Sequence, residues 1–231
     1  MGLFDWLFGR RRRQDEGQSL WEVTQRVLRD DATQLAMAPA AIRERFAAGP
    51  DWDRDPAGVG PFGYDPRNPI PVCGPFGALG YLSSLETEAG ERILFQRIGA
   101  IGLIDAFEAV TFSGSAWFIL WVDVYHPRKS RALPDGFRFT GQLPQFSGFC
   151  TRVPDFPQSF LEAKHRYAPQ LAMFYIPGSL VGDAIRGDAF HRPPEHLAAL
   201  EAVAAGLTSS LTADGTLTVT PQAMPGGRTQ H

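Results

Sequence analysis

The sequence predicts an α+β protein in which an antiparallel sheet of four to six strands is flanked by helices. Four strand-like segments follow one another over residues 79–125 with short turns between them, which favours hairpins and a meander. Segments with helical periodicity lie before and after this block. The chain has 231 residues, of which 44% are hydrophobic and 20% charged, as is typical of a single globular domain.

Two helices are expected ahead of the sheet. Ser19 is a suitable cap for the first, because Glu22 follows at the spacing of a capping box. A second helix is expected from Pro39 to Gly49, since proline suits the first turn of a helix. The apolar stripe of the first helix comprises Leu20, Val23, Val27 and Leu28.

A long loop is expected over residues 50–75, where proline and glycine are frequent. A loop of this length inside a compact domain is usually functional or packed as a cover. Three aspartates alternate near its start. They do not predict a calcium loop, because Pro56 and Phe62 occupy the positions that would need glycine and glutamate.

The sheet is expected to be built from two successive hairpins with turns at Gly90 and Gly114. The last strand is apolar on both faces along most of its length, which is typical of a central strand covered on both sides. In a regular strand Asp123 and His126 would point to opposite faces and form no catalytic pair. The four expected strands are residues 79–87, 91–100, 104–112 and 115–125.

Beyond the sheet, residues 137–158 are expected to be irregular. A hairpin is predicted over residues 208–220, because Asp214 and Gly215 are a strong two-residue turn signal. Further segments are a short helix over residues 160–167, an apolar segment of either type over residues 169–176, and a helix over residues 194–207 that has Gly206 near its end.

These elements imply three regions: an amphipathic, basic segment with a hinge over residues 1–18, a single α+β domain over residues 19–220, and a tail over residues 221–231. The helices and the long loop ahead of the sheet are expected to cover one side of it. The C-terminal helices are expected to cover the other side.

The first thirteen residues form a short apolar stretch followed by four arginines, so they are not a signal peptide. On a bilayer, the aromatic side chains would lie among the headgroups and the arginines against anionic lipid. We expect this segment to contact the membrane or a protein partner; the alternatives are a disordered tail and docking on the protein's own surface. The contact residues are Leu3, Phe4, Trp6, Leu7, Phe8, Arg10, Arg11, Arg12 and Arg13.

Charge and cysteine content limit the class of protein. The net charge is −3 in total, and the net charge of +3 on residues 1–13 leaves −6 on the rest. An acidic body argues against a nucleic-acid-binding protein. Cys73 and Cys150 are expected to be reduced thiols in the cytoplasm, and no motif predicts a cofactor or a metal site.

The exit of the last strand, Asp123-Val-Tyr-His-Pro-Arg-Lys, is the main candidate for a site, because sites often lie where strands end. His126 would carry protons and Arg128 would bind an anion, with Tyr125 and Lys129 as further binding residues. The alternative is a hydrogen-bonded structural histidine followed by a solvated basic loop.

Two stretches of the sequence resemble known bacterial proteins. The start, MGLFD-x-LFG, is shared by several kinds. The block from NPIPVCGP through LFQR to DVYHPR resembles a bacterial family with an NPIPV-x-GP start, an LFHR-like strand and a DVYHPR-type strand exit. That resemblance covers about 65 residues and implies no activity. Gln96 stands where the pattern has histidine, which weakens any site built on paired histidines from two strands.

Three functions are compatible with the sequence. The first is a non-catalytic binding or adaptor protein, located in the cytoplasm and held at the inner membrane face or on a partner through residues 2–13. The second is an enzyme that acts on an anionic or carbonyl substrate through His126 and Arg128. The third is a carrier whose aromatic cavity for a small ligand is lined by Trp117, Trp121 and Phe107.

Overall fold

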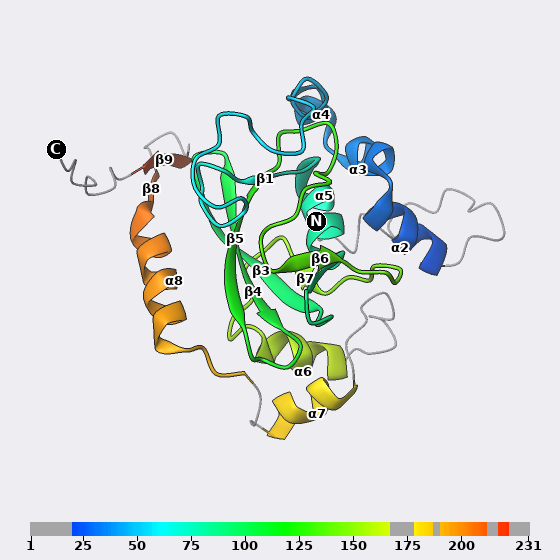
Figure 1. The fold of residues 1–231 in the computed structure, drawn as a ribbon, viewed down its shortest axis with the longest axis vertical. Helices are drawn as coiled ribbons and strands as arrows, with labels where there is room; N and C mark the ends of the chain where they lie inside the picture. The colour runs from blue at the N-terminus through cyan, green and yellow to red at the C-terminus, as the bar shows by residue number, and fades with distance from the viewer. Residues whose placement is uncertain (1–19, 167–177, 187–189, 212–216, 222–231) are drawn as a thin grey trace.

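A mixed five-stranded sheet forms the centre of the computed structural model, which describes residues 20–166, 178–186, 190–211 and 217–221. The strand order is β1-β5-β4-β3-β7 (Figure 1). The predicted α+β class is confirmed. The strands are β1 (Ile70–Pro71), β3 (Ile93–Ile101), β4 (Ile104–Thr111), β5 (Trp117–Asp123) and β7 (Gly148–Phe149).

The predicted meander is confirmed for β3, β4 and β5, which pair antiparallel in sequence order. The sheet as a whole is mixed, because β1 pairs parallel with β5 and β7 pairs parallel with β3. Each of these edge strands has two residues and belongs to a loop that returns to the sheet. Two separate pairs also form, β2 (Leu85–Thr87) with β6 (Phe137–Phe139) and β8 (Leu207–Leu211) with β9 (Leu217–Pro221).

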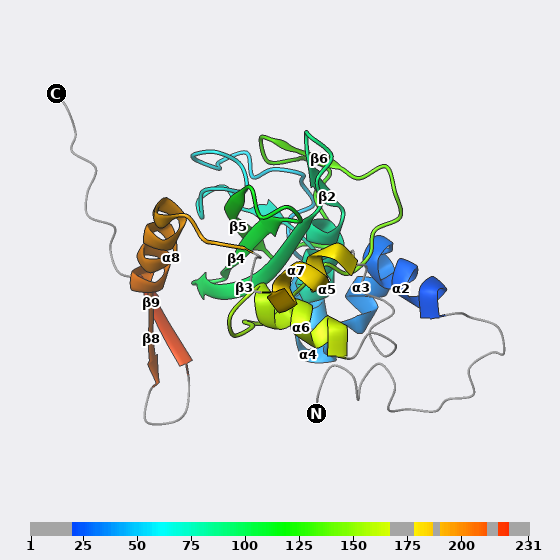
Figure 2. The ribbon, with the colours of Figure 1, turned by 90° about the horizontal axis from the view of Figure 1, so that it is seen from below.

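Helices lie on both faces of the sheet, but of the C-terminal helices only α8 is seen opposite the N-terminal ones, and α6 and α7 lie at the lower end of the sheet in Figure 1. Figures 1 and 2 show α8 on the opposite side of the sheet from α5, and the N-terminal helices gather around α5. The first side carries α2 (Leu20–Arg29), α3 (Asp31–Met37), α4 (Ala40–Ala47) and α5 (Gly74–Ser83). The C-terminal helices are α6 (Gln158–Arg166), α7 (Gly178–Arg186) and α8 (Pro194–Gly206).

The predicted strand over residues 79–87 is wrong, because most of it belongs to helix α5. Pro75 lies in the first turn of this helix, and eight of its ten residues are buried. A helix that is apolar on all sides has no stripe to distinguish it from a buried strand. Only residues 85–87 form a strand, and they pair mainly with β6.

The register of the sheet decides which side chains share a face. Glu108 lies opposite Ile119 and Gln96 opposite Glu108, so these side chains share the face of Trp117 and Trp121. Phe107 lies opposite Leu120 and therefore points to the other face. The predicted aromatic cavity of Trp117, Trp121 and Phe107 is therefore wrong, because Phe107 lies across the sheet from both tryptophans.

The long loop covers the outer edge of β5. This agrees with the expectation that a loop of this length could be packed as a cover. The backbone N–H of Trp121 donates to the carbonyl of Gly63 at 2.8 Å. Leu120 and Val122 are fully buried on one face, and Trp121 is buried on the other, so this part of β5 is covered on both faces. The loop therefore provides a hydrogen-bond acceptor along the part of the β5 edge that β1, with only two residues, does not reach.

Several expected segments lie outside the described residues. They are residues 1–18, the apolar segment 169–176, the turn at Asp214 and Gly215, and the tail after Pro221. None of the helices in the described part of the chain combines the length and apolar character needed to cross a membrane.

Close packing of α5 against α2 predicts the effect of Gly80→Ala. A Cβ at Gly80 would lie 2.3 Å from the carbonyl oxygen of Leu28 and 2.8 Å from Nε2 of Gln34. We expect a loss of about 1–3 kcal/mol in the free energy of unfolding, although alanine has the better helix propensity. Urea unfolding measures this. Gly141→Ala, which meets nothing within 4 Å, is the control, and an equal effect of both would contradict the packing argument.

Candidate functional site at the exit of strand β5

The chain does not leave β5 as a regular strand. The strand ends at Asp123, whose Oδ1 accepts a hydrogen bond from the backbone N–H of Tyr125 at 3.0 Å. Tyr125 then pairs with Cys73 in an antiparallel bridge, although β1 pairs parallel with β5. The hydrogen bond between Asp123 and Tyr125 closes a local turn, which changes the direction of the side chains that follow.

The turn brings His126 against Asp123. Nε2 of His126 lies 3.1 Å from Oδ2 of Asp123, and Nδ1 lies 2.7 Å from the carbonyl oxygen of Pro50. The prediction that these two side chains point to opposite faces is therefore wrong, because it assumed a strand that stays regular. The His126 side chain is only 4% exposed.

Both ring nitrogens of His126 face acceptors, which favours the doubly protonated imidazolium. Burial lowers the pKa of His126, but the hydrogen bonds to Asp123 and Pro50 outweigh burial, so the pKa is raised above its ordinary value. An imidazolium has no free lone pair. His126 therefore acts here as a buried clamp between the long loop and the sheet.

Arg128 is held by the same loop. Its Nε lies 2.5 Å from Oδ1 of Asp51, and its Nη1 lies 2.6 Å from Oδ1 of Asp53. The hydrogen bond from Arg128 lowers the pKa of Asp53. The alternating aspartates of the loop are thus partners for the basic strand exit.

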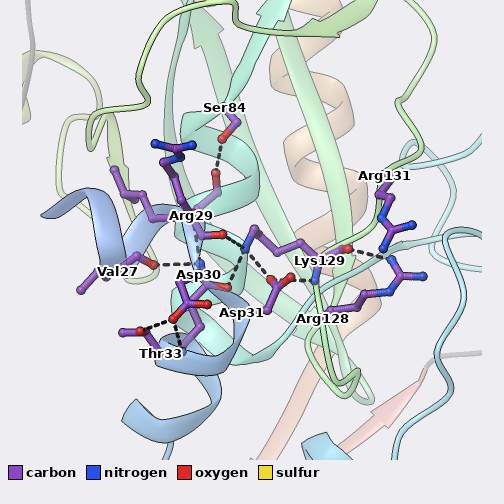
Figure 3. Close-up of polar contacts among 12 residues, drawn as sticks. Val27, Arg29, Asp30, Asp31, Thr33, Ser84, Arg128, Lys129 and Arg131 are labelled. Carbon is purple, nitrogen blue, oxygen red and sulfur yellow. Dashed lines mark hydrogen bonds and ion pairs between the residues drawn. The ribbon is translucent and has the colours of Figure 1, made fainter. Parts of the chain in front are cut away.

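Lys129 joins the strand exit to the turn between α2 and α3 (Figure 3). Its Nζ donates to Oδ1 of Asp31 at 2.5 Å, to Oε1 of Gln34 at 2.9 Å and to the carbonyl of Arg29 at 3.3 Å. These three acceptors match the three donors of an ammonium group.

Tyr125 is also engaged within the fold. Its ring packs edge-on against Phe46 with the centroids 5.4 Å apart, and the guanidinium of Arg45 lies 4.7 Å from the ring centre. The structure therefore brings the predicted site residues together, but in contacts with α4, the long loop and the α2–α3 turn. This matches the structural histidine of the alternative interpretation. The solvated basic loop of that alternative is wrong, because the side chains of Arg128 and Lys129 are mostly buried and ion-paired.

A cavity of about 520 Å³ opens beside Lys129, between α2 and the chain that follows β6. Three cations, Arg29, Lys129 and Arg131, and one carboxylate, Asp31, line it. The charges of Asp31 and Lys129 offset each other. Among the described residues, Arg29 and Arg131 form no direct ion pair, although the charge of Arg131 contributes to the lowered pKa of Asp53. The lining itself therefore has a surplus of positive charge.

A second polar cluster, centred on Glu108 of β4, was not predicted from the sequence. The Glu108 side chain is 1% exposed and accepts from Arg192 Nε at 2.5 Å, Arg192 Nη2 at 3.1 Å and Gln96 Nε2 at 2.7 Å. Nε2 of His196 lies 3.2 Å away. The Trp117 ring packs against the ring of His196 and against the guanidinium of Arg192. The cluster fastens α8 and the chain before it to the sheet.

Burial alone would raise the pKa of Glu108, yet the hydrogen bonds from His196, Arg192 and Gln96 lower it to about 2. Four donor contacts fill the acceptor sites of the carboxylate. A cavity of about 320 Å³ lies beside the cluster. The partners are 12 to 88 residues apart in the sequence, so no local motif signals them. The only hint of this cluster in the sequence is Gln96, which stands where the LFHR pattern has histidine.

Both cysteines are free thiols, with Cys73 buried and Cys150 partly buried. Burial raises the pKa of Cys73 to about 11 and also raises that of Cys150. In the ranges that the structure describes, no group of histidine, cysteine and acidic residues could hold a metal ion.

Comparison with known proteins adds no relative to this picture. No family model matches the chain, and no curated protein or solved structure matches it. The fold and site together define an α+β protein whose basic strand exit is internally paired.

The clamp predicts a pH-dependent effect of Asp123→Asn. The raised pKa of His126 means that the clamp contributes stability below pH 6.5, and that this stability is lost as the pH rises through the folded-state pKa. We expect the substitution to lower the free energy of unfolding by about 1.5–3 kcal/mol below pH 6.5. Chemical unfolding measures it. A difference that does not shrink at alkaline pH would contradict the clamp.

The Glu108 cluster predicts a larger loss for Glu108→Gln. Removing one charge of a buried pair leaves Arg192 uncompensated and costs about 3–5 kcal/mol. Because the folded-state pKa is about 2, the loss is expected above pH 4.5 and should shrink as the pH falls toward 2. Unfolding curves over this range measure it. Glu86→Gln, whose partner Arg138 is 55% exposed, is the control and should cost about 1 kcal/mol or less.

Proposed function

We propose that this protein is a non-catalytic binding protein that docks on the cytoplasmic face of a bacterial membrane through residues 2–13. The observation that carries the proposal is the state of His126. Both of its ring nitrogens face internal acceptors, and its side chain is 4% exposed. The one histidine expected to carry protons at the strand exit is thus committed to holding the fold.

The same observation weighs against the alternative enzyme. A reaction at the exit would need His126 to release Asp123 or Pro50, and Arg128 to release two aspartates. Each of these charge-assisted hydrogen bonds contributes on the order of 1.5–3 kcal/mol. Substrate binding would have to offset several of them before any chemistry began.

Charge supports the membrane as the docking surface. The body of the chain carries −6, so an anionic bilayer repels it. The four arginines of the N-terminal segment offset this repulsion, at about 1 kcal/mol each near such a surface. Its apolar side chains, two phenylalanines and a tryptophan among them, suit the headgroup region.

Vesicle flotation tests the proposal. We expect the full chain to float with vesicles that contain phosphatidylglycerol and to remain at the bottom with vesicles of phosphatidylcholine alone. A chain that lacks residues 2–13 should lose flotation, whereas one that lacks residues 222–231 should keep it. Added salt should weaken binding, since the Debye length is about 10 Å at 0.1 M and about 3 Å at 1 M.

Equal flotation with and without residues 2–13 would refute this role for the segment. If the full chain does not float, but a host protein is recovered with it only when residues 2–13 are present, the docking surface is a protein partner and the membrane proposal fails.

A further inference from the structure

We propose that the face formed by α2 and the chain after β6 is a second contact with the same anionic membrane, and that the two arginines bordering its cavity bind phospholipid headgroups. This inference rests on the proposed function, because it concerns the same bilayer. It uses residues that lie within the described structure and far in sequence from the N-terminal segment.

The apolar part of this face consists of Phe139 and Leu143, which line the cavity beside Lys129. Their exposed fractions are 38% and 47%, and both are among the few large hydrophobic residues that are exposed in the described structure. Water contact at two such neighbouring side chains is unfavourable. Insertion into a bilayer interface would remove it.

The polar part is the positive rim of the cavity. Figure 3 places Arg29 and Arg131 on opposite sides of Lys129, so the two guanidinium groups border the cavity rather than converge on one point. Lys129 is already bound to three acceptors. This arrangement suits a surface of several phosphates better than a single small anion, because each arginine can engage a different headgroup.

The chain after β6 is held in place before any contact with lipid. The backbone N–H of Thr140 donates to the carbonyl of Ser84 at 2.8 Å. Nε2 of Gln25 donates to the carbonyl of Pro144 at 2.8 Å, and Nη2 of Arg92 donates to that of Gln145 at 3.0 Å. The ring of Phe139 also packs edge-on against Tyr81. Such preorganisation reduces the entropy lost on binding.

The position of α2 connects this face to the N-terminal segment. Arg29 ends α2 and lines the cavity, and Leu20 begins the same helix, separated from the segment by residues 14–19. Ten helical residues span about 15 Å. In Figures 1 and 2 the chain after β6 runs beside α2, and the Gln25–Pro144 hydrogen bond joins them. Because only residues 14–19 separate the N-terminal segment from α2, the proposal requires one bilayer to contact both residues 2–13 and this face.

Flotation of the full chain with paired variants tests the inference. Arg29→Ala with Arg131→Ala should lower partition onto phosphatidylglycerol vesicles by about fivefold per arginine at low salt, and the effect should fade at high salt. Phe139→Ser with Leu143→Ser should lower it by roughly tenfold at every salt concentration. The controls are Arg152→Ala and the pair Val59→Ser with Leu103→Ser, which alter exposed residues away from this cavity. Unchanged thermal midpoints confirm folding.

The outcomes separate this inference from the proposed function. If removal of residues 2–13 abolishes flotation while both cavity variants bind like the wild type, the N-terminal docking stands and the second contact is refuted. If the full chain does not float on any vesicle, both fail. Loss in the cavity variants that the control variants reproduce would also refute the second contact.

Discussion

The buried imidazolium of His126 is the interaction on which the arrangement of this protein depends. It holds the carbonyl of Pro50 on one side and the carboxylate of Asp123 on the other. One ring thereby fixes the start of the long loop to the end of the central strand. A buried polar group of this kind is stable only when all its partners are present, so it specifies one arrangement of the two segments.

Arg128 and Lys129 extend the same junction in two directions. Arg128 binds the loop at Asp51 and Asp53, and Lys129 binds the turn between α2 and α3. The exit of β5 therefore contacts the long loop, the α2–α3 turn and, through Tyr125, helix α4. Lys129 donates a hydrogen bond to the carbonyl of Arg29 at the end of α2, and Arg29 borders the cavity that we assign to the membrane-facing side. Helix α2 is thus the element that connects the N-terminal segment to the folded domain and also borders the second proposed contact with the membrane.

A good part of the fold could be predicted from the sequence. The meander of β3, β4 and β5 follows from successive strand-like segments with short turns between them, and α8 follows from its start at Pro194 and end at Gly206. Helix α5 could not be predicted, because it is buried all round and rich in glycine, and its identity depends on close packing against Leu28. The parallel edge strands β1 and β7 form where a loop returns to the sheet, so no local sequence pattern predicts them.

The candidate site was predictable in its residues but not in its contacts. The basic side chains of the strand exit stand together in the sequence, but their loop and helix partners lie 75 to 100 residues away. The His126–Asp123 contact depends on a strand that ends early, through the Asx turn at Tyr125. The Glu108 cluster joins β3, β4 and the chain before α8, and such long-range pairing leaves no spacing to recognise.

The protonation state of His126 tests the central claim most directly. Nitrogen-15 NMR of the imidazole ring at neutral pH reports whether each ring nitrogen carries a proton. A structural clamp predicts that both nitrogens of His126 are protonated and that the ring stays so above pH 6.5, the ordinary pKa of histidine. An uncharged ring at neutral pH would contradict the account. One nitrogen would then be free to accept a proton, and His126 would again be a candidate base.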